Sequence, residues 1–294
     1  MLSPQSEVLR GLQPAGLPLS TDLAVPFFAQ AEYYCGPASL AMALSHTGTK
    51  ITPDEVAGQV FLPGRQGSLQ VEMLAATRRH GKVAYVLEPG LDHLLREIAD
   101  GTPVITLENQ GPPLIPVWHY SVAMGFDLDR AEIKRHTGTS QARREPLVVF
   151  DYFWAKARRW AMVAMPPERI PVTASELRYA EAVAALERVA GQTANAARAY
   201  GAMLARWPQS LAAWMGRGNT AHAAGDLNGA EAAFRRAVQL HPDAVAAHNN
   251  LAQTLLDLGR ITEARAAAEH AVRLGGPLQA RAQETLNAAL ARKP

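Results

Sequence analysis

The sequence is poor in several residue types that would point to particular protein classes. Cys35 is its one cysteine in 294 residues, so no internal disulfide or cysteine-based metal cluster can form. Basic and acidic residues number 29 and 27, a formal net charge of +2 without a basic stripe, which argues against nucleic-acid binding. No stretch approaches the roughly 18 apolar residues that a membrane-spanning helix needs. We expect no metal, no cofactor and no transmembrane segment.

Apolar residues, by contrast, are plentiful. They make up 48% of the chain, and 294 residues suffice for two domains. Three prolines lie within residues 1–21, where no signal peptide is recognisable, and further prolines at 166, 167 and 171 interrupt the chain again. We therefore divide the chain into a leader or linker (1–21), a first domain (22–167), a linker (168–176) and a helical region (177–294).

The single cysteine stands where a reactive thiol is commonly built. Cys35 precedes Gly36-Pro37 and a run of helix-forming residues, so it is expected at the N-terminus of a helix. The positive end of the helix dipole favours the thiolate, which is the nucleophile in cysteine chemistry. For this segment alone, a buried cysteine acting as a small hydrophobe is the alternative.

A cysteine nucleophile needs a base, and His119 is the best placed of the nine histidines. It lies in segment 116–126, whose β-branched and aromatic residues predict a strand that would hold the imidazole rigidly. An ordinary strand histidine is the alternative. Gln30, five residues before Cys35, offers an amide that, with the Cys35 backbone N–H, could hold the oxyanion of a tetrahedral intermediate.

The order of the predicted elements favours an α+β layout for the first domain. Thr52 and Glu55 form a predicted capping box that starts a helix, and glycines end the next two helices. Helices first and antiparallel strands after them fit this class. After the capping-box helix we expect helices at 69–79 and 91–99, and strands at 103–107, 118–125, 132–136, 147–150 and 160–164.

Two motifs carry a resemblance to a known family. They are Val25-Pro26-Phe27-Phe28-Ala29-Gln30 with Tyr34-Cys35-Gly36-Pro37-Ala38-Ser39-Leu40-Ala41-Met42, and Trp118-His119-Tyr120-Ser121-Val122. Over about residues 22–167 the chain resembles the bacteriocin-processing (double-glycine leader) peptidase-like family, which has a papain-like fold. The plant papain signature is not matched, so the likeness is to the bacterial branch.

The resemblance implies roles for three residues and a location. Cys35 would be the nucleophile, His119 the base and Gln30 the oxyanion-hole residue. Related proteins are often exported or lipid-anchored in the bacterial envelope. We expect a periplasmic or lipid-anchored protein if an upstream signal was removed, and a cytoplasmic one otherwise.

The sequence departs from the family at the third catalytic position. The family usually places an aspartate in the turn after the strand that follows the histidine. Here that strand ends in His136-Thr137-Gly138, without a carboxylate. We expect His136 or Thr137 in this position, because a neutral group can still fix the imidazole tautomer. Asp151, after the strand-like segment 147–150, is the second candidate.

The C-terminal region repeats every 34 residues, the period of tetratricopeptide repeats. The strongest copy has Trp214, Gly218, Ala230 and Phe234 at the repeat's spacing. Small residues in such repeats pack between helices, so stacked copies share one core. We expect an all-α solenoid with repeats at 177–210, 211–244 and 245–278, closed by a helix at 279–292.

Polar residues on the first helices of these repeats are expected to face the concave groove. They could bind an extended peptide or a partner's tail, although solvated side chains would have the same pattern. These residues are Asn219, His222, His248, Asn249, Asn250 and Gln253.

Together, the patterns predict a cysteine peptidase that cleaves a peptide bond in a protein substrate recruited by the repeats. A catalytically degenerate, peptidase-like scaffold that binds a protein partner through the repeat groove is the alternative, and a transferase or amidase is a third. The peptidase hypothesis predicts fast labelling of Cys35 by iodoacetamide below pH 7, slowed by His119→Ala.

Overall fold

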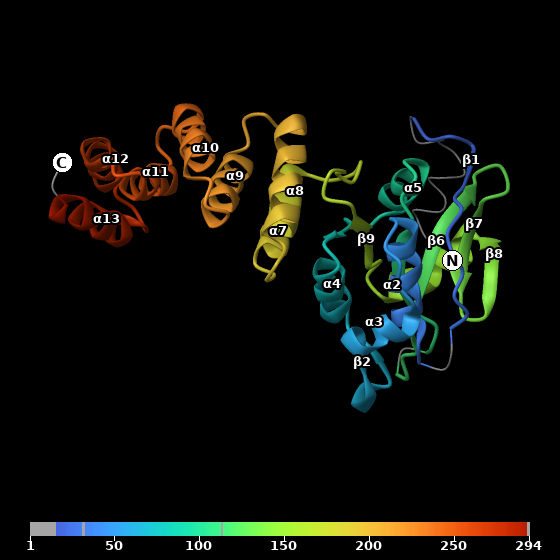
Figure 1. Cartoon of the computed structure of the whole chain (residues 1–294). Coiled ribbons are helices and arrows are strands. Elements are labelled where there is room, and N and C mark those ends of the chain that lie inside the picture. Colours follow the sequence, from blue (N-terminus) through green and yellow to red (C-terminus); the bar gives the residue numbers. More distant parts are fainter. Residues whose placement is uncertain (1–15, 31–32, 113, 293–294) are drawn as a thin grey trace. The chain divides into compact units, whose positions relative to one another are not determined.

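The computed structural model describes residues 16–30, 33–112 and 114–292, and the chain divides into two compact units, 1–178 and 179–294 (Figure 1). The first unit combines N-terminal helices with an antiparallel sheet, and the second is helical. This confirms the predicted α+β domain followed by an all-α solenoid. Most of the predicted leader, residues 1–15, lies outside the described residues.

Helix α3 begins where the local sequence signals it. Thr52 accepts a hydrogen bond from the Glu55 backbone while the Glu55 carboxylate accepts one from the Thr52 backbone, which confirms the capping box. The helices are α2 (Cys35–His46), α3 (Pro53–Val60), α4 (Gln70–Arg79), α5 (Leu91–Ala99) and α6 (Leu147–Lys156), with a short 3₁₀ turn η1 (Pro63–Arg65).

One seven-stranded antiparallel sheet organises this unit. Its strands run in the order β4-β9-β5-β6-β7-β8, and β1 pairs with β6. A small hairpin, β2 with β3, stands apart. The strands are β1 (Ser20–Asp22), β2 (Phe61–Leu62), β3 (Gly67–Ser68), β4 (Val83–Val86), β5 (Val104–Asn109), β6 (Trp118–Asp127), β7 (Glu132–Thr137), β8 (Ser140–Pro146) and β9 (Ala161–Met165).

The predicted strand at 147–150 is wrong, because these residues form the first turn of α6. The run Leu147-Val148-Val149-Phe150 has strand-like composition, but Leu147, Phe150 and Trp154 are the positions that become buried, with a helical spacing. The Phe150 and Trp154 rings stack 5.4 Å apart along the helix. The strand β8 was not predicted, because it is a charged, mostly exposed edge strand without an apolar run.

Helix α2 lies in the middle of the core of this unit. Residues Gly36 to Leu44 are all buried, so the helix has no solvent-facing side over two turns. Its apolar side chains pack against Tyr120 and Val122 of β6 and against α3 and α4 (Figure 1). Burial on all sides fixes the helix, and with it the position of Cys35 at its first residue.

The predicted linker, 168–176, is held to the first unit. Its Thr173 donates through the backbone N–H and the hydroxyl to Glu97 Oε1, at 2.8 and 2.6 Å. Glu97 is fully buried in α5, and burial raises the pKa of its carboxyl. The last linker residue, Glu176, is the first residue of α7.

The second unit is a succession of helices, as expected for a solenoid of tetratricopeptide repeats. Fully buried alanines, including Ala230 and Ala264, lie where neighbouring helices touch. Within the described residues of the chain, no helix is long and apolar enough to span a bilayer. The helices are α7 (Glu176–Glu187), α8 (Thr193–Arg206), α9 (Leu211–Ala223), α10 (Leu227–Leu240), α11 (Val245–Asp257), α12 (Ile261–Leu274) and α13 (Gln279–Ala291).

Candidate active site

The residue after Cys35 is a glycine because Ser68 of β3 occupies the space beside it. A β-carbon on Gly36 would lie 2.4 Å from Ser68 Oγ and 2.6 Å from Ser68 Cβ. The hairpin can therefore close against the start of α2 only where this side chain is missing. This contact fixes the helix end that carries the thiol.

The Cys35 sulfur lies among backbone amides. Hydrogen bonds from the backbone of Tyr120, Gly36 and Cys35 itself would stabilise a thiolate, but burial is the larger effect and raises the pKa of the thiol. The prediction of a thiolate favoured by the helix N-terminus is therefore wrong for the resting protein, because the same burial that fixes α2 disfavours the charged sulfur. The sulfur thus contacts the backbone of Tyr120, the residue that follows His119 in β6.

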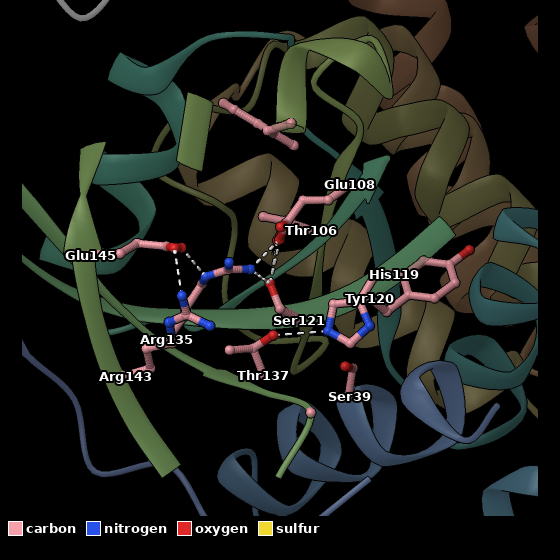
Figure 2. A network of polar contacts seen from close by, with 12 residues as sticks. Ser39, Thr106, Glu108, His119, Tyr120, Ser121, Arg135, Thr137, Arg143 and Glu145 are labelled. Atoms are coloured by element: carbon pink, nitrogen blue, oxygen red, sulfur yellow. Dashed lines mark hydrogen bonds and ion pairs between the residues drawn. The ribbon is translucent and has the colours of Figure 1, made fainter. Parts of the chain in front are cut away.

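The imidazole of His119 is held by Thr137 of the neighbouring strand β7. His119 Nε2 lies 2.8 Å from Thr137 Oγ1, and Figure 2 shows the two side chains facing each other. Burial, and then the positive charge of Arg135, lower the pKa of His119 to about 4. The ring is therefore neutral near pH 7, with Nδ1 as the nitrogen that Thr137 leaves free.

Gln30 connects the helix and the strand that carry Cys35 and His119. Its side chain is 8% exposed, and its Oε1 accepts a hydrogen bond from the Gly138 N–H at 2.9 Å. This donor fixes the orientation of the amide, so Nε2 points to Ser39 Oγ of α2 and to the Tyr120 carbonyl of β6, both at 3.4 Å. These two contacts are long for hydrogen bonds, which leaves the N–H groups available to a stronger acceptor.

Two adjacent residues at the end of β7 thus organise the site. Thr137 holds the imidazole and Gly138 holds the Gln30 amide. Gly138 has φ +56°, in the left-handed region that favours glycine, as the chain turns from β7 into β8. The structure therefore brings Cys35, His119, Gln30 and Thr137 together around the Tyr120 backbone.

The other two candidates for the third position lie elsewhere. His136 points away from His119: its Nε2 bonds the Val25 carbonyl at 3.0 Å, and its Nδ1 accepts from the Ala142 N–H at 3.0 Å. Asp151 is buried in α6, where its carboxylate accepts from Arg159 at 2.8 and 3.2 Å. Both side chains have structural partners, so the structure does not bring either to the imidazole.

Sequence reasoning missed a buried charged cluster on the same side of the sheet as His119. It comprises Glu108, Ser121, Arg135 and Glu145, from strands β5 to β8 (Figure 2). The available signal was weak: Glu108 is a single charged residue directly after the apolar segment 103–107, which was predicted as a strand. Recognising the cluster needed the strand register, which pairs Glu108 with His119. Among the described residues, no group of three or more His, Cys, Asp or Glu side chains is placed to hold a metal ion.

The second unit contains a cavity of about 230 Å³. Five of the six predicted groove residues line it: Asn219, His222, Asn249, Asn250 and Gln253. Arg281 of α13 also lines it. His248 does not. Its Nε2 bonds the Pro242 carbonyl at 2.9 Å and its ring lies 4.2 Å from that of His270, so it packs between α11 and α12.

Similarity to known proteins is found separately for each part. Residues 22–138 match the model of the Peptidase_C39 like family. Residues 186–244 and 221–275 match two models of the tetratricopeptide repeat. A comparison with curated proteins finds no match.

Solved structures with similarity align with about two fifths of the chain. An O-GlcNAc transferase mutant from Thermobaculum terrenum is 26% identical over an alignment that covers 40% of this chain and 23% of the transferase (TM-score 0.36). The TPR2B domain of yeast Sti1, in a complex with pHsp70, is 17% identical over 39% of this chain and 98% of its own (TM-score 0.37). The type III secretion chaperone SycD of Yersinia enterocolitica is 18% identical over 39% and 82% (TM-score 0.36).

The two sets of family matches agree with the two units of the structure. Helix α2 and strands β5 to β7 fall within residues 22–138, and helices α8 to α12 fall within the repeat matches. The chain carries a domain of the Peptidase_C39 like family fused to tetratricopeptide repeats.

Proposed function

We propose that the protein is a cysteine peptidase that cleaves a peptide bond in a protein substrate recruited by its repeats. The observation that carries the proposal is the bond between His119 Nε2 and Thr137 Oγ1, on the strand whose next amide meets the Cys35 sulfur. The bond orients the imidazole, and cysteine catalysis requires an oriented base that can reach the thiol. The match of residues 22–138 to a peptidase-like family supports the same chemistry.

The reaction begins with proton transfer within this pair. When Nε2 donates to Thr137 Oγ1, the Nδ1 lone pair is free to accept the Cys35 S–H proton as the sulfur bonds the substrate carbonyl carbon. The π electrons of the carbonyl move to its oxygen. Gln30 Nε2 and the Cys35 backbone N–H would donate to that oxyanion.

The intermediate then collapses and releases the first product. The carbonyl re-forms, the C–N bond breaks, and the Nδ1 proton passes to the leaving amine. Water, deprotonated by the now neutral His119, attacks the thioester, and the proton returns to the Cys35 sulfur as the acid product leaves. The site needs no group beyond these side chains and water.

The repeats supply the binding that the small site lacks. The cavity of about 230 Å³ presents amide side chains, among them Asn249 and Gln253, that can bond the backbone of an extended segment. A substrate held there would reach the thiol at a raised effective concentration.

A second function is favoured by one specific observation. The imidazole has a hydroxyl where the family usually has a carboxylate, and burial raises the pKa of the Cys35 thiol. A peptidase-like scaffold that binds a protein partner through the repeats would need neither a carboxylate beside the imidazole nor an activated thiol.

Thiol labelling and cleavage separate the two functions. Because Cys35 is the one cysteine, iodoacetamide incorporation reports on it alone. The peptidase function predicts cleavage of unfolded casein that Cys35→Ser abolishes, and labelling at pH 7 that His119→Ala slows and the matched control His93→Ala does not. Equal labelling of the wild type and His119→Ala, without cleavage, would establish the scaffold instead.

A further inference from the structure

Helix α2 buries one hydroxyl within its apolar run. Residues Gly36 to Leu44 are all buried, and Ser39 is the one residue among them whose side chain carries a hydrogen-bonding group. Ser39 is fully buried. Burying a hydroxyl costs free energy unless the hydroxyl gains a partner, and alanine is the better helix former. Packing alone therefore does not explain a serine at this position.

The Ser39 hydroxyl lies on the same side of α2 as the thiol. Ser39 follows Cys35 by four residues, a spacing that puts two side chains on one face of a helix. Helical side chains lean toward the N-terminus, so the Ser39 side chain leans back toward the turn that carries Cys35. In Figure 2 the hydroxyl points from α2 toward the sheet, on the side where His119 and Thr137 lie.

The partner of this hydroxyl is the Gln30 amide. Gln30 Nε2 lies 3.4 Å from Ser39 Oγ, and among the described residues this is the one hydrogen-bond contact of the hydroxyl. Gln30 Oε1 accepts from the Gly138 N–H at 2.9 Å, which fixes one end of the amide. The amide can still pivot about a single bond to Oε1. The direction of Nε2 is therefore set by its two acceptors, Ser39 Oγ and the Tyr120 carbonyl, both at 3.4 Å.

Tyr120 connects this amide to the thiol. Its carbonyl faces Gln30 Nε2, and its backbone N–H forms a hydrogen bond with the Cys35 sulfur. The two acceptors of the amide are distant enough to direct the N–H groups without satisfying them. An oxyanion formed at the sulfur would be the stronger acceptor, because hydrogen bonds to charged groups are shorter and stronger.

We propose that Ser39 is a positioning residue that turns the Gln30 amide toward the oxyanion formed at Cys35. The inference rests on the proposed function, in which Gln30 Nε2 and the Cys35 N–H hold that oxyanion. A donor that is already oriented stabilises the developing charge without reorganising. Ser39 should therefore affect attack of the sulfur on a carbonyl, and it should leave alkylation of the same sulfur unchanged.

Two reagents separate these reactions in the full-length protein. With p-nitrophenyl acetate, the S–C bond forms as the carbonyl π electrons move to oxygen and the S–H proton passes to His119. The carbonyl then re-forms and p-nitrophenolate leaves. With iodoacetamide, the S–C bond forms as iodide leaves and the S–H proton is lost, without an oxyanion. Mass spectrometry of the Cys35 peptide gives both rates, and the ratio of acetylation to alkylation measures the oxyanion's stabilisation.

The expected ratios distinguish Ser39 from a merely structural residue. Gln30→Ala should lower the ratio roughly a hundredfold, and Ser39→Ala roughly tenfold. Ser45→Ala is the matched control: it removes the other serine hydroxyl of α2, which lies 3.4 Å from the Ile51 carbonyl, and should leave the ratio unchanged. In Gln30→Ala/Ser39→Ala the ratio should equal that of Gln30→Ala, because Ser39 acts through the amide.

A second variant keeps the test decisive if Ser39→Ala fails to fold. Ser39→Thr retains the hydroxyl and adds a methyl group to a filled site, so its stability should fall while its ratio stays near the wild-type value. A wild-type ratio in Ser39→Ala or in Gln30→Ala would overturn the proposal. So would a ratio that falls in Ser39→Thr, or one that falls further in the double variant than in Gln30→Ala.

The ratio also separates this inference from the peptidase function. Acetylation of the thiol occurs whether or not the protein cleaves a peptide bond. A lowered ratio in Ser39→Ala, without casein cleavage by the wild type, would refute the peptidase and keep the role of Ser39. Casein cleavage with an unchanged ratio would refute the role of Ser39 alone.

Discussion

The Thr137 hydroxyl lies 2.8 Å from His119 Nε2. A hydroxyl can donate as well as accept, whereas a carboxylate only accepts. Thr137 therefore holds the ring without forcing a tautomer. The productive form, with the proton on Nε2 and the lone pair on Nδ1, competes with the reverse form in which Thr137 donates.

Replacing Thr137 tests this competition directly. Thr137→Val keeps the shape and removes the acceptor, so labelling of Cys35 by iodoacetamide should slow roughly tenfold, equivalent to about 1.4 kcal/mol. Thr137→Asn supplies an amide oxygen, and we expect labelling at least as fast as in the wild type. The measurement is the rate at pH 7. A Thr137→Val protein that labels at the wild-type rate would show that this hydroxyl does not orient the base.

The pH dependence of labelling tests the state of the resting thiol. Because burial raises the pKa of Cys35 while the His119 ring stays neutral, the labelling rate should still increase above pH 9. A preformed ion pair would instead give a plateau from about pH 5 upward, because the thiolate would already be present there. Labelling reactions between pH 5 and 10 that are quenched at set times and analysed by mass spectrometry distinguish the two profiles.

Local signals predicted the elements of this protein better than they predicted the site's electrostatics. The Thr52 capping box and the 34-residue period each depend on residues close in sequence, so they gave α3 and the repeat helices correctly. The strand-like run at 147–150 failed because composition is ambiguous over four residues and only packing selects the helix. The thiol's environment also required packing, since the depth of burial of α2 outweighs its dipole.

The charged cluster was beyond sequence reasoning for a different reason. Arg135 and Glu108 are 27 residues apart, and a shift of one residue in either strand would turn one of them to the opposite face. The bulge between Arg135 and Thr137 further decides which β7 side chains meet His119. The family resemblance could name Thr137 as a candidate partner of His119, but nothing in the sequence named the partners of Arg135.

Gly36 is expected to be intolerant of a side chain. Gly36→Ala would place a methyl group 2.4 Å from Ser68 Oγ, so we expect a loss of about 1–3 kcal/mol in the free energy of unfolding. Gly58→Ala in α3 is the matched control: nothing lies within 4 Å of its new methyl group, and it should stabilise the protein by roughly 0.5–1 kcal/mol. Chemical denaturation measures both changes.

The cause of the Gly36 effect can be checked by removing the opposing side chain. In Gly36→Ala/Ser68→Gly the clash is absent, so the free energy of unfolding should recover in part. A double variant as unstable as Gly36→Ala would place the cause in the helix backbone and not in this contact.

Stability toward acid should depend on His119. Its pKa is about 4 in the folded protein and near 6.5 in the unfolded chain, so between these values the unfolded chain binds more protons. Folding is therefore penalised as the pH falls through this window, by up to roughly 3 kcal/mol once the pH is below 4. His119→Gln has no such proton to bind, and its stability relative to the wild type should rise steadily from pH 7 to pH 4. Above pH 7 the difference between the two proteins should be constant, because the ring is neutral in both states. Denaturation curves at several pH values measure this difference in stability. A difference that does not change with pH would mean that the pKa of His119 in the folded protein is ordinary and that neither burial nor Arg135 lowers it.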